Sequence, residues 1–566
     1  MSLKKRLVRR EVVGTVVGVS PLLSRVLSAR GIQDAADINP GLGALPSPEG
    51  FKGLDAAARL VADALESGRR ILIVGDFDAD GATSCALLVS GFRAMGAGHV
   101  RFLVPNRFEF GYGLTPEIVD VAARQSPDLL ITVDNGISSL EGVEHARSLG
   151  IDVVITDHHL PGDRLPGANA IVNPRQPGCA FPAKHLAGVG VAFYLLSAVR
   201  ADLRRRGWFS SREEPNLASY LPLVALGTVA DVVPLDACNR ILVSEGLRRL
   251  RAGQGSPGLL ALLRQASIEP REMTSRDLAF GIAPRLNAAG RLDNMTIGID
   301  CLLAPDDETA MSLAIELDTL NRERRRIEDE MKAQVLDLDD DSGWISPKDA
   351  VGVVVCHESW HQGVIGIVAA RVKERVHRPV IAFAPGSEGQ LKGSARSIPG
   401  LHIRDALDAI ATKHPGLLVK FGGHAMAAGL TLAAGDIDRF AAAFDAEARD
   451  WLDDEDLEQV VLSDGEIDEE ITKDLAQSVI EAAPWGQQFD EPVFDGRFEV
   501  QDQRIVGGRH LKLTLRPEQG ARSIDAICFN HGTWLLEPRF QHLAYRLDLN
   551  RYRGLVSPQL IIEAIL

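Results

Sequence analysis

The stretch ILIVGDFDADGATS, residues 71–84, decides the fold. Residues 71–74 form a continuous apolar run, which is typical of a strand buried on both faces of a parallel sheet. Three aspartates follow at alternate positions, Asp76, Asp78 and Asp80, and the next residues favour a helix over 83–95. The stretch therefore predicts a buried strand that ends in an acidic turn and continues as a helix.

Three further apolar runs lead into acidic residues in the same way. They are residues 129–133 before Asp134, residues 153–156 before Asp157, His158 and His159, and residues 224–229 before Asp231. Apolar strands separated by helices indicate a doubly wound parallel sheet. Because ligands bind outside the carboxyl ends of the strands in such sheets, we expect the four ends to share one crevice.

Several carboxylates in one crevice repel one another unless cations neutralise them. Carboxylates with one or two imidazoles suit Mn²⁺ or Mg²⁺ rather than a metal that prefers thiolates. The set is large enough for two ions about 3.5–4 Å apart, an arrangement used in phosphoryl hydrolysis. A single aspartate at a strand end is more often a turn or helix cap. Four such ends in one domain favour a metal site.

At these residues the sequence resembles the DHH phosphoesterase family, whose triplet is here Asp157-His158-His159. The matching stretches in the first half are GDFDADGATS (75–84), VPNRFEFGYGL (104–114), VDNGIS (133–138), TDHH (156–159), LAGVGVAF (186–193), GTVADVVPL (227–235) and APRLNAAGRL (283–292). Those of the DHH-associated domain are WHQGVIGIVAAR (360–371), KGSARSIPG (392–400) and FGGHAMAAG (421–429). The likeness spans nearly the whole chain, and only residues 484–487 depart from the family pattern.

The resemblance implies a metal centre with two divalent cations, Mn²⁺ by preference or Mg²⁺. It implies the ligands Asp78, Asp80, Asp134, His158 and Asp231. It also implies that Asp76 and His159 are further ligands or lie directly behind them. We expect both of these residues, together with Asn287, to take part in catalysis.

A second group of residues is expected to bind the substrate. By the resemblance these are Arg107, Arg285, Ser394 and Arg396, to which we add Arg291, Tyr112 and His424. Arginine suits a phosphate because its planar fork grips two oxygens and stays charged, and backbone N–H groups at the glycine turns around 393–396 and 422–424 can hold phosphate oxygens. Tyr112 is equally well explained as a base-stacking residue or as a core aromatic.

The fold class predicted is α/β and multidomain. The expected segments are an N-terminal extension (1–50), a parallel-sheet DHH catalytic domain (51–304), a long connector helix (305–345), a smaller α/β DHH-associated substrate-binding domain (346–444), an acidic linker region (445–489) and an OB-type barrel that binds single strands (490–566). The barrel is expected because short alternating strands follow at 497–500, 510–515, 524–529 and 547–552. Four arginines of the connector, Arg322, Arg324, Arg325 and Arg326, face either a nucleic-acid channel or acidic neighbours on an exposed helix.

The family resemblance implies a function. It implies a metal-dependent exonuclease that degrades single-stranded DNA 5′→3′ to 5′-mononucleotides, in DNA repair and recombination. We expect a monomer whose partners are single-stranded DNA with a 5′ end, a helicase and a single-stranded-DNA-binding protein. Two alternatives stay open: a DHH phosphoesterase for short oligoribonucleotides or cyclic dinucleotides, and a non-catalytic scaffold that binds single strands.

Composition agrees with a globular protein of several domains. The 566 residues have a formal net charge of −16, which by itself argues against a nucleic-acid binder. Residues 445–470, however, hold 13 acidic residues and one arginine, so this tract carries −12 and the rest of the chain only −4. The six cysteines are scattered, which suggests a reducing compartment. No apolar stretch is long enough to cross a membrane, so a soluble cytoplasmic protein is expected.

Overall fold

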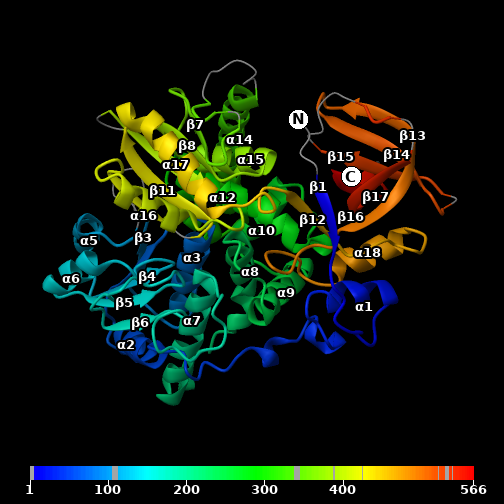
Figure 1. Ribbon diagram of the computed structural model, residues 1–566. Coiled ribbons are helices and arrows are strands. Elements are labelled where there is room, and N and C mark those ends of the chain that lie inside the picture. Colours follow the sequence, from blue (N-terminus) through cyan, green and yellow to red (C-terminus); the bar gives the residue numbers. More distant parts are fainter. Residues whose placement is uncertain are drawn as a thin grey trace.

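The computed structural model describes residues 5–104, 113–336, 344–347, 349–386, 389–423, 425–520, 522–529, 535–537, 540–552 and 554–566, with the side chains of 332–336 set aside. Figure 1 shows three bodies: a parallel-sheet domain at lower left, a smaller α/β domain above it and a β-barrel at right. The multidomain α/β fold with a barrel is therefore confirmed. Among the described helices, none combines the length and apolar character that a membrane crossing requires.

The first domain is built on a parallel sheet of five strands in the order β3-β2-β4-β5-β6. The strands are β2 (Ile71–Gly75), β3 (Val100–Leu103), β4 (Leu129–Val133), β5 (Asp152–Thr156) and β6 (Ala170–Val172). The surrounding helices are α2 (Leu54–Glu66), α3 (Ala79–Ala94), α5 (Pro116–Ala123), α6 (Leu140–Ser148) and α7 (Gly188–Arg205). Helices α5 and α6 pack on one face and α2, α3 and α7 on the other. Because both faces are buried, the central strands β2 and β4 are buried along their whole length and almost entirely apolar.

The second half of this domain is helical. Its elements are α8 (Leu221–Ala230), α9 (Ala237–Arg251), α10 (Pro257–Gln265), α11 (Ser275–Asp277), a π-helical turn (Leu278–Ile282), α12 (Ala283–Leu292) and α13 (Thr296–Leu302). The strand predicted at 224–229 is wrong, because these residues lie within α8. Helix α8 packs between α3, α7 and α9 and is buried over almost its whole length. A helix buried on every side is apolar on every side, so its sequence resembles a buried strand.

The connector is a single helix, α14 (Asp307–Leu336), as expected. It leads to the smaller domain, whose sheet has the order β10-β11-β9-β8-β7. The strands are β7 (Val353–Cys356), β8 (Val380–Pro385), β9 (Gln390–Arg396), β10 (Lys420–Gly423) and β11 (Ala427–Ala433), and the helices are α15 (Ile365–Val376), α16 (Ile403–Lys413) and α17 (Ile437–Trp451). Helix α15 covers one face of the sheet, and α16 and α17 cover the other.

The C-terminal barrel is closed and has five strands rather than the four expected. They are β13 (Phe494–Val506), β14 (His510–Pro517), β15 (Ile524–Cys528), β16 (Phe540–Tyr552) and β17 (Leu555–Ile565). The unexpected strand is β17, which contains Pro558. A proline removes a backbone donor and so argues against a strand in the sequence. Helix α18 (Lys473–Glu481) packs against β16.

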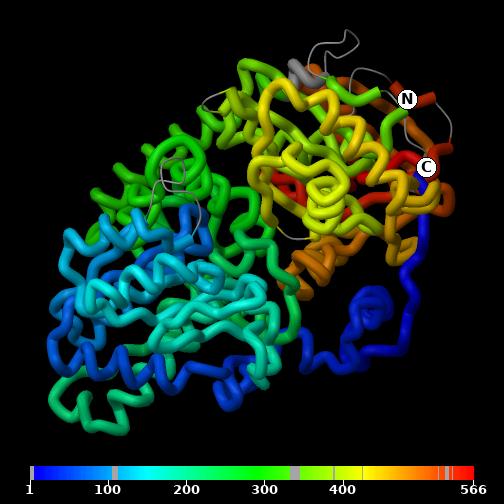
Figure 2. Tube along the Cα trace, turned by 60° about the vertical axis from the view of Figure 1, so that its left-hand side comes forward, coloured from blue at the N-terminus to red at the C-terminus, as the bar shows by residue number. Residues whose placement is uncertain are grey.

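The N-terminal segment fastens onto the barrel side of the molecule. Helix α1 (Pro21–Ser28) follows β1 (Lys5–Arg9), and β1 pairs in parallel with β12 (Gln459–Ser463), inside the tract expected to be an acidic linker. Figure 2 shows this segment, in blue, rising from the first domain to the barrel. Nearby, Nη1 of Arg30 lies 2.7 Å from Oδ1 of Asp464, with both side chains almost fully buried. The acidic tract is thus partly structured and partly neutralised by the basic N-terminus.

Residues 484–487 join the barrel to the first domain. The ring of Trp485 stacks on that of Phe489, and the guanidinium of Arg30 lies over the Trp485 ring. Ser275 Oγ donates to the Trp485 carbonyl at 2.6 Å. This packing fixes the barrel beside the helical half of the first domain.

Candidate metal and catalytic site

The turn after β2 is shaped by its own aspartates. The side chain of Asp78 caps α3, accepting from the N–H groups of Asp80 at 2.9 Å and Gly81 at 3.0 Å. The Asp76 carboxylate accepts from Phe77 N at 2.8 Å. A Cβ on Gly81 would lie 2.5 Å from the Asp76 carbonyl oxygen, so only glycine fits this turn. The acidic turn predicted from the sequence is therefore held in shape by its own hydrogen bonds and by this glycine.

Asp80 points from the first turn of α3 towards the start of α7. Its carboxylate accepts from Gly188 N at 2.6 Å and Val189 N at 2.9 Å. The N-terminus of a helix favours a negative charge. Burial, with the charge of Asp78 as the next cause, nevertheless raises the pKa of Asp80 to about 7.

Asp134 follows β4 in a strained conformation, with φ at +60°. Such angles are rare for residues other than glycine and are concentrated at functional sites. Asn135 stabilises the turn by donating to the carbonyls of Val133 at 2.8 Å and Val74 at 3.2 Å, which ties the ends of β4 and β2 together. On the other side, a Cβ on Gly188 would lie 2.7 Å from the Asp134 Cβ. Asp134 is thus held tightly at the sheet edge.

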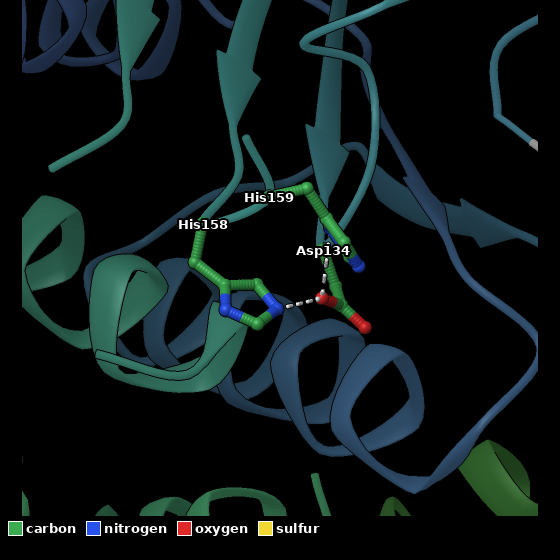
Figure 3. Close-up of side chains that lie close together, drawn as sticks. All are labelled: Asp134, His158 and His159. Atoms are coloured by element: carbon green, nitrogen blue, oxygen red, sulfur yellow. Dashed lines mark ion pairs between the residues drawn. The ribbon is translucent and has the colours of Figure 1, made fainter. Parts of the chain in front are cut away.

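The Asp157-His158-His159 triplet follows β5. His158 Nε2 lies 3.0 Å from Oδ1 of Asp134 and 3.4 Å from Oδ2 of Asp231. The first of these contacts is drawn in Figure 3, with the His159 ring on the other side of the same carboxylate. Asp231 caps the end of α8 rather than a strand. The helix therefore brings its aspartate to the point where the predicted strand would have placed it.

Three groups of side chains have ligand atoms within 4.8 Å of one another. They are Asp76, Asp78 and Asp134; Asp80, His158 and Asp231; and Asp134, His158 and His159. All seven expected metal-site residues therefore converge at one place. Burial, with the charge of neighbouring aspartates added to it, raises the pKa of Asp134 and of Asp231 as well.

The donor set fits divalent cations. Two buried oxygens, Oδ1 of Asp134 and Oδ2 of Asp231, accept no hydrogen bond from the described part of the chain. Buried carboxylate oxygens without donors are costly unless a cation neutralises them. Hard oxygen ligands with imidazole nitrogen match Mn²⁺ and Mg²⁺. Asp134 belongs to two of the three groups, so its carboxylate can be shared between two neighbouring ions.

Asp157, for which the sequence predicted no role of its own, orients the His159 ring and fixes the backbone of the triplet. It accepts from His159 Nδ1 at 2.7 Å and from the backbone N–H groups of His158 at 2.7 Å and Ile137 at 2.9 Å. Burial raises the pKa of Asp157, but the contacts with His159 outweigh it and the net pKa is lowered. Burial lowers the pKa of His159, but its hydrogen bond to Asp157 and the charges of Asp157, Asp76 and Asp78 together outweigh burial and raise it. The sequence contains a signal for this role, the carboxylate that directly precedes the two histidines, because a carboxylate next to an imidazole commonly fixes the imidazole's tautomer.

The expected catalytic role of Asn287 is not apparent in its contacts. Its Oδ1 accepts from Ala79 N at 2.8 Å, which fixes the start of α3 from α12. The closeness of α12 to the acidic turn is also seen at Gly290, where a Cβ would lie 1.8 Å from the Phe77 carbonyl oxygen. Asn287 therefore holds the turn that carries the aspartates.

The expected substrate residues lie in different places. Arg396 and Ser394 are neighbours on β9, where Arg396 Nη1 donates to Ser394 Oγ at 3.2 Å. Arg291, at the end of α12, donates to the Gly363 carbonyl of the smaller domain at 3.3 Å. Arg285, on the same helix, instead contacts Asp318 of α14. Arg107, Tyr112 and His424 lie outside the described residues.

Most connector arginines whose role stayed open have acidic partners. Arg322 pairs with Asp318 at 2.6 Å, Arg324 with Glu328 at 3.1 Å and Arg326 with Glu323 at 2.7 Å. These contacts support the interpretation of a salt-bridged helix. Arg325 differs, since it lines a cleft beside the barrel.

Comparison with known proteins gives a consistent result. Residues 70–228 match the model of the DHH family, N-terminal domain, residues 348–450 that of the DHHA1 domain and residues 463–564 that of the RecJ OB domain. The single-stranded-DNA-specific exonuclease RecJ of Dickeya dadantii is 53% identical, with 96% of this chain and 95% of the relative aligned. Crystal structures of Thermus thermophilus RecJ in complex with Mn²⁺ and with Mg²⁺ superpose with TM-scores of 0.80 and 0.74, at 31% and 29% identity. They cover 100% and 99% of this chain, and 79% and 78% of the matched chains.

Proposed function

Because the chain belongs to the RecJ family of single-stranded-DNA-specific exonucleases, we propose that it hydrolyses single-stranded DNA 5′→3′ to 5′-mononucleotides with two divalent cations, Mn²⁺ or Mg²⁺. The observation that carries the proposal is the convergence of six aspartate and histidine groups around Asp134. The Thermus relatives with Mn²⁺ and Mg²⁺ support the choice of metal.

We assign the cation ligands to Asp78, Asp80, Asp134, His158 and Asp231, with Asp76 beside them. Cations held by these residues would lower the pKa of a water ligand and offset charge on the phosphorus. The chain's own part is to keep these ligands fixed, which Asn135, Gly188 and Asn287 do through the contacts described above.

His159 is suited to the proton transfer. Its Nδ1 faces the Asp157 carboxylate, which only accepts hydrogen bonds, so Nδ1 carries a proton. Its hydrogen bond to Asp157 and the neighbouring carboxylates raise the pKa of His159 against the effect of burial, which favours the form of the ring with a second proton, on Nε2. We propose that Nε2 gives this proton to the departing 3′-oxygen as the bond between that oxygen and phosphorus breaks.

We propose that arginines on two sides of the site bind the substrate. Ser394 and Arg396 stand on β9 of the smaller domain, and Arg291 joins that domain to α12. Both arginines are half-buried, and a partly buried arginine bonds phosphate strongly because less water competes for its planar fork. Arg107, Tyr112 and His424 stay predictions of the same kind.

Digestion of end-labelled single strands with Mn²⁺ tests the function. The wild-type protein should release mononucleotides from the 5′ end and leave a duplex intact. Asp134→Ala should abolish release and keep affinity for the strand, whereas Asp163→Ala, at an exposed aspartate shortly after the triplet in the sequence, should change neither. Normal hydrolysis by Asp134→Ala would show that the site assignment is wrong.

The same assay separates the two alternatives. Faster turnover of a dinucleotide or cyclic dinucleotide than of a long strand would indicate a small-substrate phosphoesterase. Binding of single strands without hydrolysis in Mn²⁺, Mg²⁺ or Co²⁺ would indicate a scaffold. The complete ligand set and the barrel favour the exonuclease over both.

We also propose a role in DNA repair and recombination, where unwound duplexes supply single strands with 5′ ends. A helicase and a single-stranded-DNA-binding protein are the partners that this role requires. Adding a helicase should make a blunt duplex degradable, and light scattering should give the mass of a monomer.

A further inference from the structure

Helix α14 carries a buried carboxylate, Asp318, which has no part in the proposed reaction so far. Asp318 is 3% exposed and lies where α14 packs against α10 and α12. Its Oδ1 is contacted by two nitrogens of Arg285, Nε at 2.9 Å and Nη2 at 2.8 Å. Its Oδ2 is contacted by Arg322 Nη2 at 2.6 Å and by Gln265 Nε2 at 3.2 Å. Both oxygens are therefore saturated with donors.

These contacts hold the Arg285 guanidinium in one orientation. Nη1 donates to the carbonyl of Gly281, one helical turn back. A guanidinium has five N–H groups, and these contacts engage three of them. One N–H remains on each terminal nitrogen, which is the pair that grips two phosphate oxygens.

The remaining pair belongs to a side chain that lines a cleft of about 920 Å³ between the first domain and the barrel. Ala230 and Val232, the neighbours of the ligand Asp231, line the same cleft, so it adjoins the metal site. Arg325 of α14 and Arg551 of β16 lie along it as well. A single strand leaving the metal site through this cleft would pass Arg285.

The contacts around Asp318 do more than fill the space between α14 and the helices packed against it. Burial raises the pKa of Asp318, but Gln265, Arg285 and Arg322 outweigh it and lower the pKa below its ordinary value. The carboxylate is therefore charged at neutral pH, as Arg285 is. A charged carboxylate fixed by two further residues keeps a long, otherwise flexible arginine in a single position.

We propose that Asp318 is a positioning residue for the reaction, which holds Arg285 so that its two remaining N–H groups take a backbone phosphate in the cleft beside the barrel. The inference rests on the proposed function, since it needs single-stranded DNA as the substrate. It gives the connector helix a part in substrate binding, in addition to joining two domains.

The test compares four proteins on oligonucleotides in which one phosphate at a time is replaced by an uncharged methylphosphonate. In the wild type, one linkage should raise KM about tenfold when neutralised, the size expected for one charge-assisted contact. Arg285→Ala and Asp318→Asn should each raise KM about tenfold on normal DNA, change kcat less than about twofold, and lose the response at that linkage. Glu323→Gln, a matched loss of an exposed carboxylate on the same helix, should behave as the wild type.

Each contrary outcome has a separate meaning. An undiminished response at that linkage in Asp318→Asn, or a loss of kcat with KM unchanged, would overturn the positioning role. Failure of Arg285→Ala to alter any linkage in an active enzyme would overturn the phosphate contact and leave the exonuclease standing. Absence of hydrolysis by the wild type would instead refute the proposed function. Gln265→Ala, which loosens Asp318 without leaving a charge unpaired, should weaken the same linkage and decides the matter if Asp318→Asn does not fold.

Discussion

Removal of the metal should make the stability of this protein depend on pH in an unusual direction. The pKa of Asp80 is raised to about 7 because its carboxylate is buried beside Asp78, and the pKa values of Asp134 and Asp231 are raised for similar reasons. Between the ordinary pKa of an aspartate and pH 7, the folded metal-free protein therefore keeps a proton that the unfolded chain has lost. Its stability falls as the pH rises through this interval.

The size of the effect follows from Asp80 alone. With a folded pKa of about 7 against 3.8 when unfolded, raising the pH from 5 to 8 costs about 2–3 kcal/mol of unfolding free energy. Asp134 and Asp231 add to the loss, and so does His159, whose raised pKa acts in the same direction. Asp128, with its pKa lowered to about 2, has already lost its proton and contributes nothing in this range. A domain of about 250 residues should lose roughly 5 °C or more in Tm.

Thermal unfolding after dialysis against a chelator measures this, at constant ionic strength from pH 5 to 8. Addition of Mn²⁺ should raise Tm most at the highest pH, because the cation replaces the bound protons. Asp163→Ala serves as the control and should reproduce the wild-type slope. A metal-free Tm that rises from pH 5 to 8, or that Mn²⁺ shifts equally at every pH, would refute the reasoning.

Two further substitutions test the framework around the site. Gly290→Ala places a Cβ 1.8 Å from the Phe77 carbonyl, so α12 must move away from the acidic turn. Isothermal titration should show Mn²⁺ affinity reduced about tenfold or more, and unchanged affinity would contradict the close packing. Arg30→Ala leaves the buried carboxylate of Asp464 unpaired and should cost about 3–5 kcal/mol, measured by urea unfolding of the transition that includes the barrel. A cost under about 1 kcal/mol would show that water reaches the pair.

The metal site could be predicted from the sequence because its geometry is local. Short apolar runs before Asp76, Asp134 and Asp157 are strands whose ends must meet at one sheet edge. The fourth run, before Asp231, was assigned to a strand and is a helix. Its aspartate still reaches the site, since burial on all sides gives a strand and a short helix the same apolar sequence. The expected position of Asp231 therefore agrees with the structure, although the strand on which the expectation rested is a helix.

Contacts between distant segments could not be predicted in the same way. Arg285 was expected to face the substrate freely, and nothing in its neighbours indicated the carboxylate 33 residues later on α14. The pairing of β1 with β12 joins a basic segment to one that composition alone marked as a solvated linker. Such pairings depend on how domains pack, which local patterns do not encode.

The pairing of β1 with β12 also has a consequence for how the protein is made. Lys5 is paired with Gln459, so a ribosome adds about 450 residues after the first strand before its partner appears, which takes about half a minute or more. Throughout that time the basic strand is complete but has nowhere to dock. On a messenger RNA that carries several ribosomes, the unpaired β1 of a shorter nascent chain lies close to a longer nascent chain whose β12 has just been synthesised. The strand made first is therefore secured only after most of the chain has been synthesised, and exchange of this strand between neighbouring chains is an assembly error to which this architecture is exposed.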